Sequence, residues 1–176
     1  QIMGETTKGE YFIPLATTEG ALVASVNRGA KACYNSGIVT SVERIGTTRG
    51  PVLQVDSLHH AKKAKDWIWQ NRTLLSSESE KTSNHINLMD VEVITVGLYL
   101  FIRFYFDCDR AMGMNMATIE SEHLIEKIAK KTKSHIIAVA GNYDVDKKPA
   151  WLNSIKGRGF IIRAETIISQ DNIKSI

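Results

Sequence analysis

Two short segments of this chain carry residues suited to acid–base chemistry at a carbonyl group. Residues 146–149 read Asp-Lys-Lys-Pro and place two ammonium groups and a carboxylate on a loop before an expected helix. Residues 13–20 hold one carboxylate, Glu19, at the start of another expected helix that is otherwise small and apolar. A lysine can stabilise an oxyanion, and a partly protonated carboxyl group can donate a proton. Each segment alone is also typical of an ordinary solvated surface.

The hydrophobic pattern predicts the elements that must position these residues. A helix is expected from a cap at Thr17 or Thr18 to about residue 34, with Glu19 in its first turn. Further along, a strand, a helix, two strands turning at Gly97, a helix and a strand follow one another. Their predicted ranges are 52–55, 57–70, 91–96, 98–106, 114–131 and 136–140. No element is predicted for the polar residues 71–88.

Two of these elements show which side faces the core. In the strand 98–106, alternate apolar residues share one face: Leu100, Ile102, Phe104 and Phe106. In the helix 114–131, the residues predicted to face the core are Ile119, Leu124, Ile125 and Ile128.

The order of elements between residues 49 and 140 predicts the fold class. The sequence β-α-β-β-α-β is that of a ferredoxin-like domain. Residues 1–48 and 141–176 do not belong to it, and we interpret them as pieces of a larger α/β domain into which the small domain is inserted. We therefore expect an α+β fold with three segments: 1–48, 49–140 and 141–176.

Composition excludes several classes of function. A net charge of +3 over 176 residues is too small to predict nucleic-acid binding. No apolar run is long enough for a membrane helix, and neither the two cysteines nor the five histidines have metal-ligand spacing. We expect a cytoplasmic protein without a metal, and, because the first residue is Gln1, a segment of a longer polypeptide.

Four segments together resemble 3-hydroxy-3-methylglutaryl-coenzyme A (HMG-CoA) reductases, of the branch found in archaea and eukaryotes. The four segments are Pro14–Ser25 with Asn27–Gly29, Thr48–Pro51, Ala111–Met116, and Gly141–Tyr143 with Asp146–Ala150. Asn153 and Gly157–Gly159 continue the last of them. Because the matches follow the family's order and cover almost the whole chain, the resemblance is specific.

The resemblance implies an enzyme of isoprenoid biosynthesis. Members of the family reduce the thioester of HMG-CoA to the primary alcohol mevalonate and release CoA, using two molecules of NADPH. The small inserted domain holds the nucleotide, and the large domain holds the acyl-CoA. The active sites form where two subunits of a homodimer meet, so a homodimer is expected.

The resemblance also assigns roles to individual residues. Lys147 would stabilise the carbonyl oxygen, and Glu19 would donate a proton at the aldehyde stage. The expected substrate-binding residues are Ser25, Asn27, Arg28, Arg49, Asn142, Asp146 and Lys148. The expected cofactor-binding residues are Arg110, Met112, Gly113, Met114 and Asn115.

The chain departs from the family's usual pattern at several positions. Arg110 stands where an aspartate is usual and Asp109 where a glycine is usual. Ala140 replaces a serine, Asp144-Val145 replaces a Cys-Thr pair, and residues 36–40 replace a glycine-rich connector. The family's catalytic histidine and a third catalytic aspartate fall outside these 176 residues, so we expect this chain alone not to turn over.

Two other hypotheses remain open at this point. In the first, Arg110 and Ala140 mark a degenerate or truncated relative that keeps only ligand binding. In the second, residues 49–140 form a free-standing ferredoxin-like module that binds RNA or a regulatory ligand. The second requires exposed aromatic residues on the sheet, for which Tyr99, Phe101 and Tyr105 are the candidates.

Overall fold

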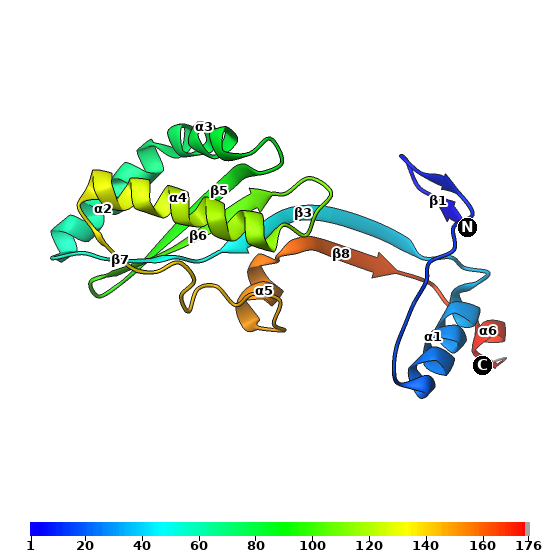
Figure 1. The fold of residues 1–176 in the computed structure, drawn as a ribbon. Helices are drawn as coiled ribbons and strands as arrows, with labels where there is room; N and C mark the ends of the chain where they lie inside the picture. Colours follow the sequence, from blue (N-terminus) through cyan, green and yellow to red (C-terminus); the bar gives the residue numbers. More distant parts are fainter. Residues whose placement is uncertain (175–176) are drawn as a thin grey trace. The chain divides into compact units, whose positions relative to one another are not determined.

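The structure is a computed structural model that describes residues 1–174. The chain forms two compact units (Figure 1). The first unit contains Gln1–Ser41 and the residues from Arg163 onward, and the second contains Val42–Ile162. Within the described residues, no helix is long and apolar enough to cross a membrane.

The first unit is built around helix α1, Gly20–Cys33. It also contains the antiparallel pair β1 (Ile2–Met3) and β2 (Lys8–Gly9), and the short helix α6 (Gln170–Lys174). The prediction that Thr17 or Thr18 caps α1 was wrong. Glu19 is the N-cap residue, in an extended conformation with φ −101°, and its own backbone N–H donates to the Thr17 hydroxyl at 3.0 Å. Because the Thr17 hydroxyl is used before the helix begins, it is not available to the first turn.

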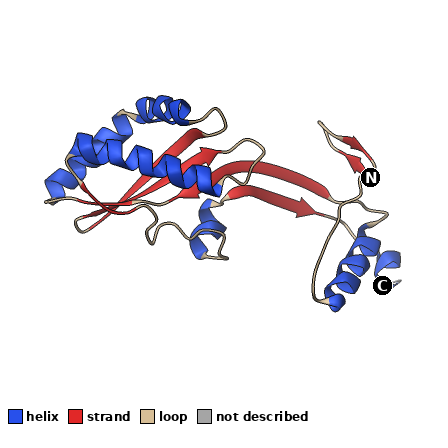
Figure 2. Cartoon of the chain, viewed as in Figure 1, coloured by secondary structure: helices blue, strands red, loops and turns tan. Residues whose placement is uncertain are grey.

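The second unit contains most of a six-stranded sheet (Figure 2). Its strands are β3 (Val39–Arg49), β4 (Val52–Gln54), β5 (Asn87–Val96), β6 (Tyr99–Asp107), β7 (His135–Ala138) and β8 (Gly159–Glu165). The order is β7-β4-β6-β3-β8, and β5 pairs with β6. Strand β4 is antiparallel to both β6 and β7. The predicted hairpin at Gly97 is confirmed, since β5 and β6 are antiparallel on either side of this residue with φ 58°.

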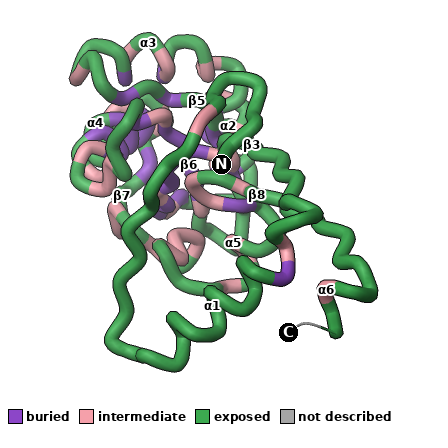
Figure 3. Tube along the Cα trace, turned by 90° about the vertical axis from the view of Figure 1, so that its right-hand side faces the viewer, coloured by how far each residue is buried: buried purple, intermediate pink, exposed green. Residues whose placement is uncertain are grey.

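Three helices and the sheet enclose the core of the second unit. They are α2 (Leu58–Gln70), α3 (Arg72–Thr82) and α4 (Met114–Thr132). The buried residues gather between these helices and β4–β6, where the tube in Figure 3 is purple. The predicted apolar face of β6 is confirmed, because all four of its residues have no exposed surface: Leu100, Ile102, Phe104 and Phe106.

Two helix predictions need correction. Ile119 is 60% exposed, whereas Leu124, Ile125 and Ile128 are fully buried as expected. The buried stripe of α4 runs through Ala117 and Ser121 at helical spacing, and Ile119 points away from it. Helix α3 lies inside the segment for which no element was predicted. It has a weak apolar pattern, and its fully buried residues are Leu75 and Ser79, so packing against β5 and α4 stabilises it more than helix propensity does.

The opposite face of the sheet holds the segment that follows β7. Arg103 on β6 is 1% exposed and donates from Nη2 to the carbonyl oxygen of Gly157 at 2.9 Å. The Tyr143 hydroxyl donates to Glu92 on β5 at 3.0 Å, and Lys156 of helix α5 (Trp151–Lys156) forms an ion pair with the same carboxylate at 2.9 Å. These contacts fix residues 143–157 to the sheet.

A buried carboxyl group in α4 provides a test of this packing. Glu120 has no exposed surface, and burial raises the pKa of its carboxyl group, although Thr82 and His123 act in the opposite direction. A native pKa above the unfolded value of about 4.5 gives stability that is complete below that pH and is lost as the pH rises through the native pKa.

We therefore predict that Glu120→Gln raises the free energy of unfolding at pH 7 by roughly 1 kcal/mol and flattens its dependence on pH. Urea denaturation between pH 4 and pH 8 measures both effects. Glu122→Gln, at an exposed position of the same helix, is the control and should change neither. A Glu120→Gln protein that is less stable than wild type at pH 7 would contradict the prediction.

Candidate functional site

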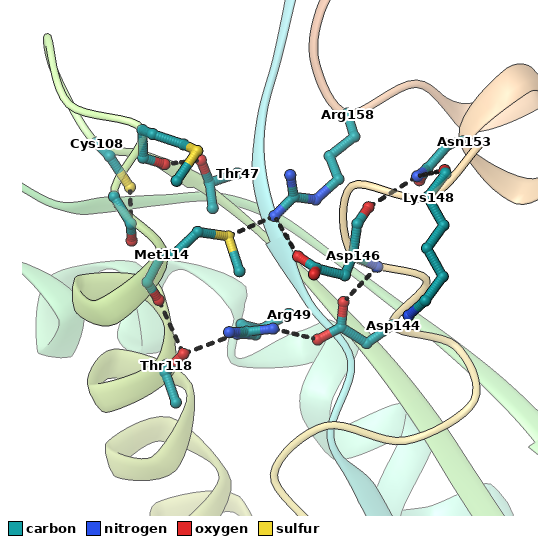
Figure 4. Close-up of polar contacts among 12 residues, drawn as sticks. Thr47, Arg49, Cys108, Met114, Thr118, Asp144, Asp146, Lys148, Asn153 and Arg158 are labelled. Carbon is teal, nitrogen blue, oxygen red and sulfur yellow. Dashed lines mark hydrogen bonds and ion pairs between the residues drawn. The ribbon is translucent and has the colours of Figure 1, made fainter. Parts of the chain in front are cut away.

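The guanidinium of Arg49 joins three segments of the second unit (Figure 4). Arg49 ends strand β3, its Nε donates to the Thr118 hydroxyl of α4 at 2.8 Å, and its Nη1 donates to the Asp144 carboxylate at 2.9 Å. The side chain of Asp144 is 1% exposed and that of Arg49 is 16% exposed. A charged pair with so little water around it is held firmly in one geometry, because either partner alone would be costly to bury.

Gly50 allows the loop that follows β7 to approach this point. A Cβ at Gly50 would lie 2.7 Å from the backbone nitrogen of Asp144 and 2.8 Å from the backbone carbon of Tyr143. In addition, the backbone N–H of Gly141 donates to the Gly50 carbonyl at 2.7 Å. Only a residue without a side chain fits such a contact. The Thr48–Pro51 junction and the loop 141–148 are therefore one structural unit.

The loop 144–148 is tightly turned and presents two lysines. Asp146 has a positive φ of 52°, and its backbone N–H donates to the Asp144 carboxylate at 3.2 Å. The side-chain amide of Asn153 in α5 donates to the carbonyl oxygens of Asp146 and Lys148 at 2.8 and 2.9 Å. Lys147 and Lys148 are exposed, and in the described part of the chain their ammonium groups have no hydrogen-bond or ionic partner. Both cations are thus available to a ligand.

Arg158 links this loop to the start of α4. Its side chain is 10% exposed, and its Nη2 lies 3.6 Å from the Asp146 carboxylate and 2.7 Å from the Met114 sulfur. Burial lowers the pKa of the Arg158 guanidinium, while Asp146 and then Asp144 raise it. The sequence alone predicts no site role for Arg158, although this residue belongs to the last of the four segments that resemble the family.

The turn before α4 is shaped by contacts on both sides. The Thr47 hydroxyl donates to the carbonyl oxygen of Met112 at 2.7 Å. Gly113, the N-cap residue of α4, has a φ of 72°, and a Cβ there would lie 2.2 Å from the Cys108 sulfur. The turn therefore requires glycine, and it leaves Met112 60% exposed.

A hollow of about 550 Å³ lies beside this turn. Three arginines and one aspartate line it together with apolar side chains: Arg44, Arg110, Arg158, Asp109, Phe106, Met112 and Phe160. Arg44 forms an ion pair with Asp107, whereas Arg110 is exposed and has no ionic or hydrogen-bond partner among residues 1–174. Positive charge next to apolar surface suits an anionic ligand that carries a ring, such as a nucleotide.

The expected site residues of the first unit are all exposed: Glu19, Ser25, Asn27 and Arg28. Lys147 belongs to the second unit, so the joint action of Glu19 and Lys147 on one carbonyl group stays a prediction.

Within the second unit the structure brings many expected residues together. Arg49 and Asp146 both contact the Asp144 carboxylate, and Asn142, Lys147 and Lys148 lie on the same loop. The expected cofactor residues occupy one turn and the first residues of α4: Arg110, Met112, Gly113, Met114 and Asn115. The sequence did not predict a place in the site for Thr118 or Arg158, and Asp144 stood out only as a departure from the family's usual pattern.

Within the described residues, no group of acidic, histidine or cysteine side chains could hold a metal ion.

Comparison with known proteins decides the family. The sequence model of hydroxymethylglutaryl-coenzyme A reductase matches residues 1–176. The chain belongs to this family. It is 40% identical over 178 residues to the 3-hydroxy-3-methylglutaryl-coenzyme A reductase of Methanothermobacter thermautotrophicus, with 100% of this chain and 45% of that protein covered. The Drosophila melanogaster reductase is 40% identical over 176 residues, with 98% of this chain and 19% of that protein covered.

The fold also matches solved reductase structures. The class II 3-hydroxy-3-methylglutaryl-CoA reductase of Streptococcus pneumoniae, solved with NADPH bound, superposes with a TM-score of 0.71 at 18% identity. The match covers 94% of this chain and 43% of that chain. This chain therefore spans less than half the length of the reductases it matches here, and its mixed α and β architecture with an antiparallel sheet is that of the family.

The close approach at Gly50 gives a prediction about the whole site. Gly50→Ala should lower the free energy of unfolding by about 2 kcal/mol or more, because a methyl group would push the backbone of residues 143–144 away from Arg49. Gly29→Ala is the matched control: nothing lies within 4 Å of a Cβ there, and alanine in a helix should stabilise by about 0.5–1 kcal/mol. Chemical denaturation of both variants is the measurement. A Gly50→Ala protein as stable as wild type would mean that the loop does not pack as described.

Proposed function

We propose that this chain is the part of an HMG-CoA reductase that holds NADPH and carries the lysine of the active site. The whole enzyme would reduce HMG-CoA to mevalonate and CoA. The observation that carries the proposal is the junction, in one unit, of the 111–116 turn with the 144–148 loop through Arg158. Family membership over the full length of the chain supports it.

The residues around the hollow fit a nicotinamide dinucleotide. Arg110, Met112, Gly113, Met114 and Asn115 would hold it, with the exposed Met112 side chain against a ring and Arg110 toward its phosphates. Gly113 would act by holding the shape of this turn, because the Cys108 sulfur lies 2.2 Å from where a Cβ of residue 113 would be. When bound, NADPH supplies the hydride that reduces the carbonyl carbon.

The loop residues would bind and polarise the substrate. We assign Lys147 to the carbonyl oxygen, where its free ammonium group would stabilise developing negative charge. Arg49, Asn142, Asp146 and Lys148 would hold the acyl end. In the first unit, Ser25, Asn27 and Arg28 would contact the CoA moiety, and Glu19 would donate the proton at the aldehyde stage.

We infer a ferredoxin-like domain, residues 49–140, inserted into a large domain to which 1–48 and 141–176 belong. The order β7-β4-β6-β5 supports it, because a β-α-β-β-α-β unit places its strands in this way. Exposed apolar side chains in the first unit, such as those of Phe12, Leu15 and Val23, support its belonging to a larger domain. The homodimer rests on the family resemblance alone, and the cytoplasmic location rests on composition alone.

A second candidate is a relative that binds ligands without turnover. Two residues favour it: Arg110 in the hollow, where the family usually has an aspartate, and Ala140, which offers no hydroxyl to the substrate. The module that binds RNA is disfavoured, because two of its three candidate aromatic residues are not exposed. Tyr105 is 7% exposed and contacts Arg103, and Phe101 is half-buried, whereas Tyr99 is 41% exposed.

Activity tests the assignment of Lys147. In the intact protein, Lys147→Met should lower kcat for NADPH oxidation dependent on HMG-CoA by about 100- to 1000-fold, since a preorganised charge at the oxyanion is lost. The absorbance of NADPH follows the reaction. Lys130→Met, at an exposed position of α4, removes the same charge elsewhere and should leave kcat unchanged. Equal rates for wild type and Lys147→Met would refute the assignment, and no activity in wild type would favour the second candidate.

Nucleotide binding tests the role of Arg110. Arg110→Asp in the intact protein should weaken NADPH binding about tenfold in a calorimetric titration, because a charge-assisted contact to phosphate is lost. Lys62→Asp makes the same change of charge at an exposed position of α2 and should have little effect. Tighter binding in Arg110→Asp would instead indicate that the arginine disables the site, as the second candidate requires.

A further inference from the structure

Arg49, which we propose to hold the acyl end of the substrate, already has a carboxylate beside its guanidinium. Asp144 accepts a hydrogen bond from Arg49 Nη1 at 2.9 Å, and its side chain is almost completely shielded from water. Its second oxygen accepts from the backbone N–H of Asp146 at 3.2 Å. Asp144 is thus an integral part of the loop, and its charge acts on Arg49 through a poorly screening environment.

The charges around this pair cancel. Arg49 is compensated by Asp144, and Arg158 lies 3.6 Å from the carboxylate of Asp146. The positive charges left on the loop are those of Lys147 and Lys148, whose side chains are exposed. A ligand carboxylate that reaches Arg49 therefore meets a guanidinium whose charge is largely balanced, with a second carboxylate adjacent to it.

Arg49 nevertheless keeps donors for a ligand. A guanidinium has five N–H groups. One of them is donated to Thr118 and one to Asp144, so the other N–H groups can still meet an acceptor. A carboxylate can bind at Arg49, but its attraction to the guanidinium is reduced by repulsion from Asp144.

We propose that Asp144 is a specificity-determining residue, an internal carboxylate that weakens the capture of carboxylate-bearing acyl groups at Arg49. The inference rests on the proposed function, in which Arg49 faces the acyl end of the thioester. Asp144 reduces the selectivity of the site for acyl-CoA molecules that carry a distal carboxylate. With a neutral residue at position 144, such molecules would bind more tightly relative to acyl-CoA molecules without that carboxylate.

The test compares two acyl-CoA molecules of equal chain length, glutaryl-CoA with a distal carboxylate and valeryl-CoA without one. Calorimetric titrations use the intact protein and Asp144→Asn, because asparagine keeps the shape and the acceptor for the Asp146 N–H. We expect Asp144→Asn to bind glutaryl-CoA about tenfold more tightly and valeryl-CoA with unchanged affinity. Asp90→Asn, which removes the acidic partner of Arg72 elsewhere in the second unit, is the control and should change neither affinity.

The outcomes separate this inference from the proposed function. If both ligands bind and Asp144→Asn changes their affinities equally or not at all, the inference is overturned while acyl-CoA binding stands. If neither ligand binds any of the proteins, the proposed function and this inference both fail. Should Asp144→Asn not fold, as judged by thermal denaturation, Asp144→Cys replaces it with the residue usual in the family, and the same two outcomes apply.

Discussion

The buried ion pair between Arg49 and Asp144 is the interaction on which the described site depends. It brings the end of β3, the first turns of α4 and the loop after β7 to one point, since Arg49 also donates to Thr118. Because a cation with so little exposure is costly to separate from its buried carboxylate partner, the ion pair and the Thr118 hydrogen bond hold these three segments together. Gly50 makes this possible by leaving room for the loop backbone.

Two surfaces with different chemistry meet at this point. On one side is the glycine turn at 113 with its cationic and apolar hollow, and on the other is the loop that carries Lys147 and Lys148. Arg158 touches both, through Met114 and Asp146. A cofactor and a carbonyl substrate that react with each other must be held at such a junction, because hydride transfer requires contact between them. The geometry and the family membership therefore support the same function.

Much of the second unit could be predicted from the sequence, because local pattern determines it. The alternation Leu100 to Phe106 gave the buried face of β6, and Gly97 gave the hairpin. Helix α3 was not predicted because its apolar pattern is weak and its stability comes from packing. Ile119 was predicted to face the core but lies on the exposed side of α4. The pairing of Arg49 with Asp144 spans 95 residues, and no local signal connects them. The roles of Glu19 and Lys147 followed from family resemblance and not from spacing.

The most direct test of the central claim is to locate NADPH on the protein by NMR. Addition of NADPH to the isotopically labelled intact protein should shift the backbone amides of residues 110–116 and of Arg158 more than any others. A second hollow of about 500 Å³, lined by α3 and β5 residues including Arg72 and Asp90, is the internal comparison and should not respond. Shifts centred on that second hollow, or no shifts in a folded protein, would contradict the claim that this unit holds the cofactor at the Gly113 turn.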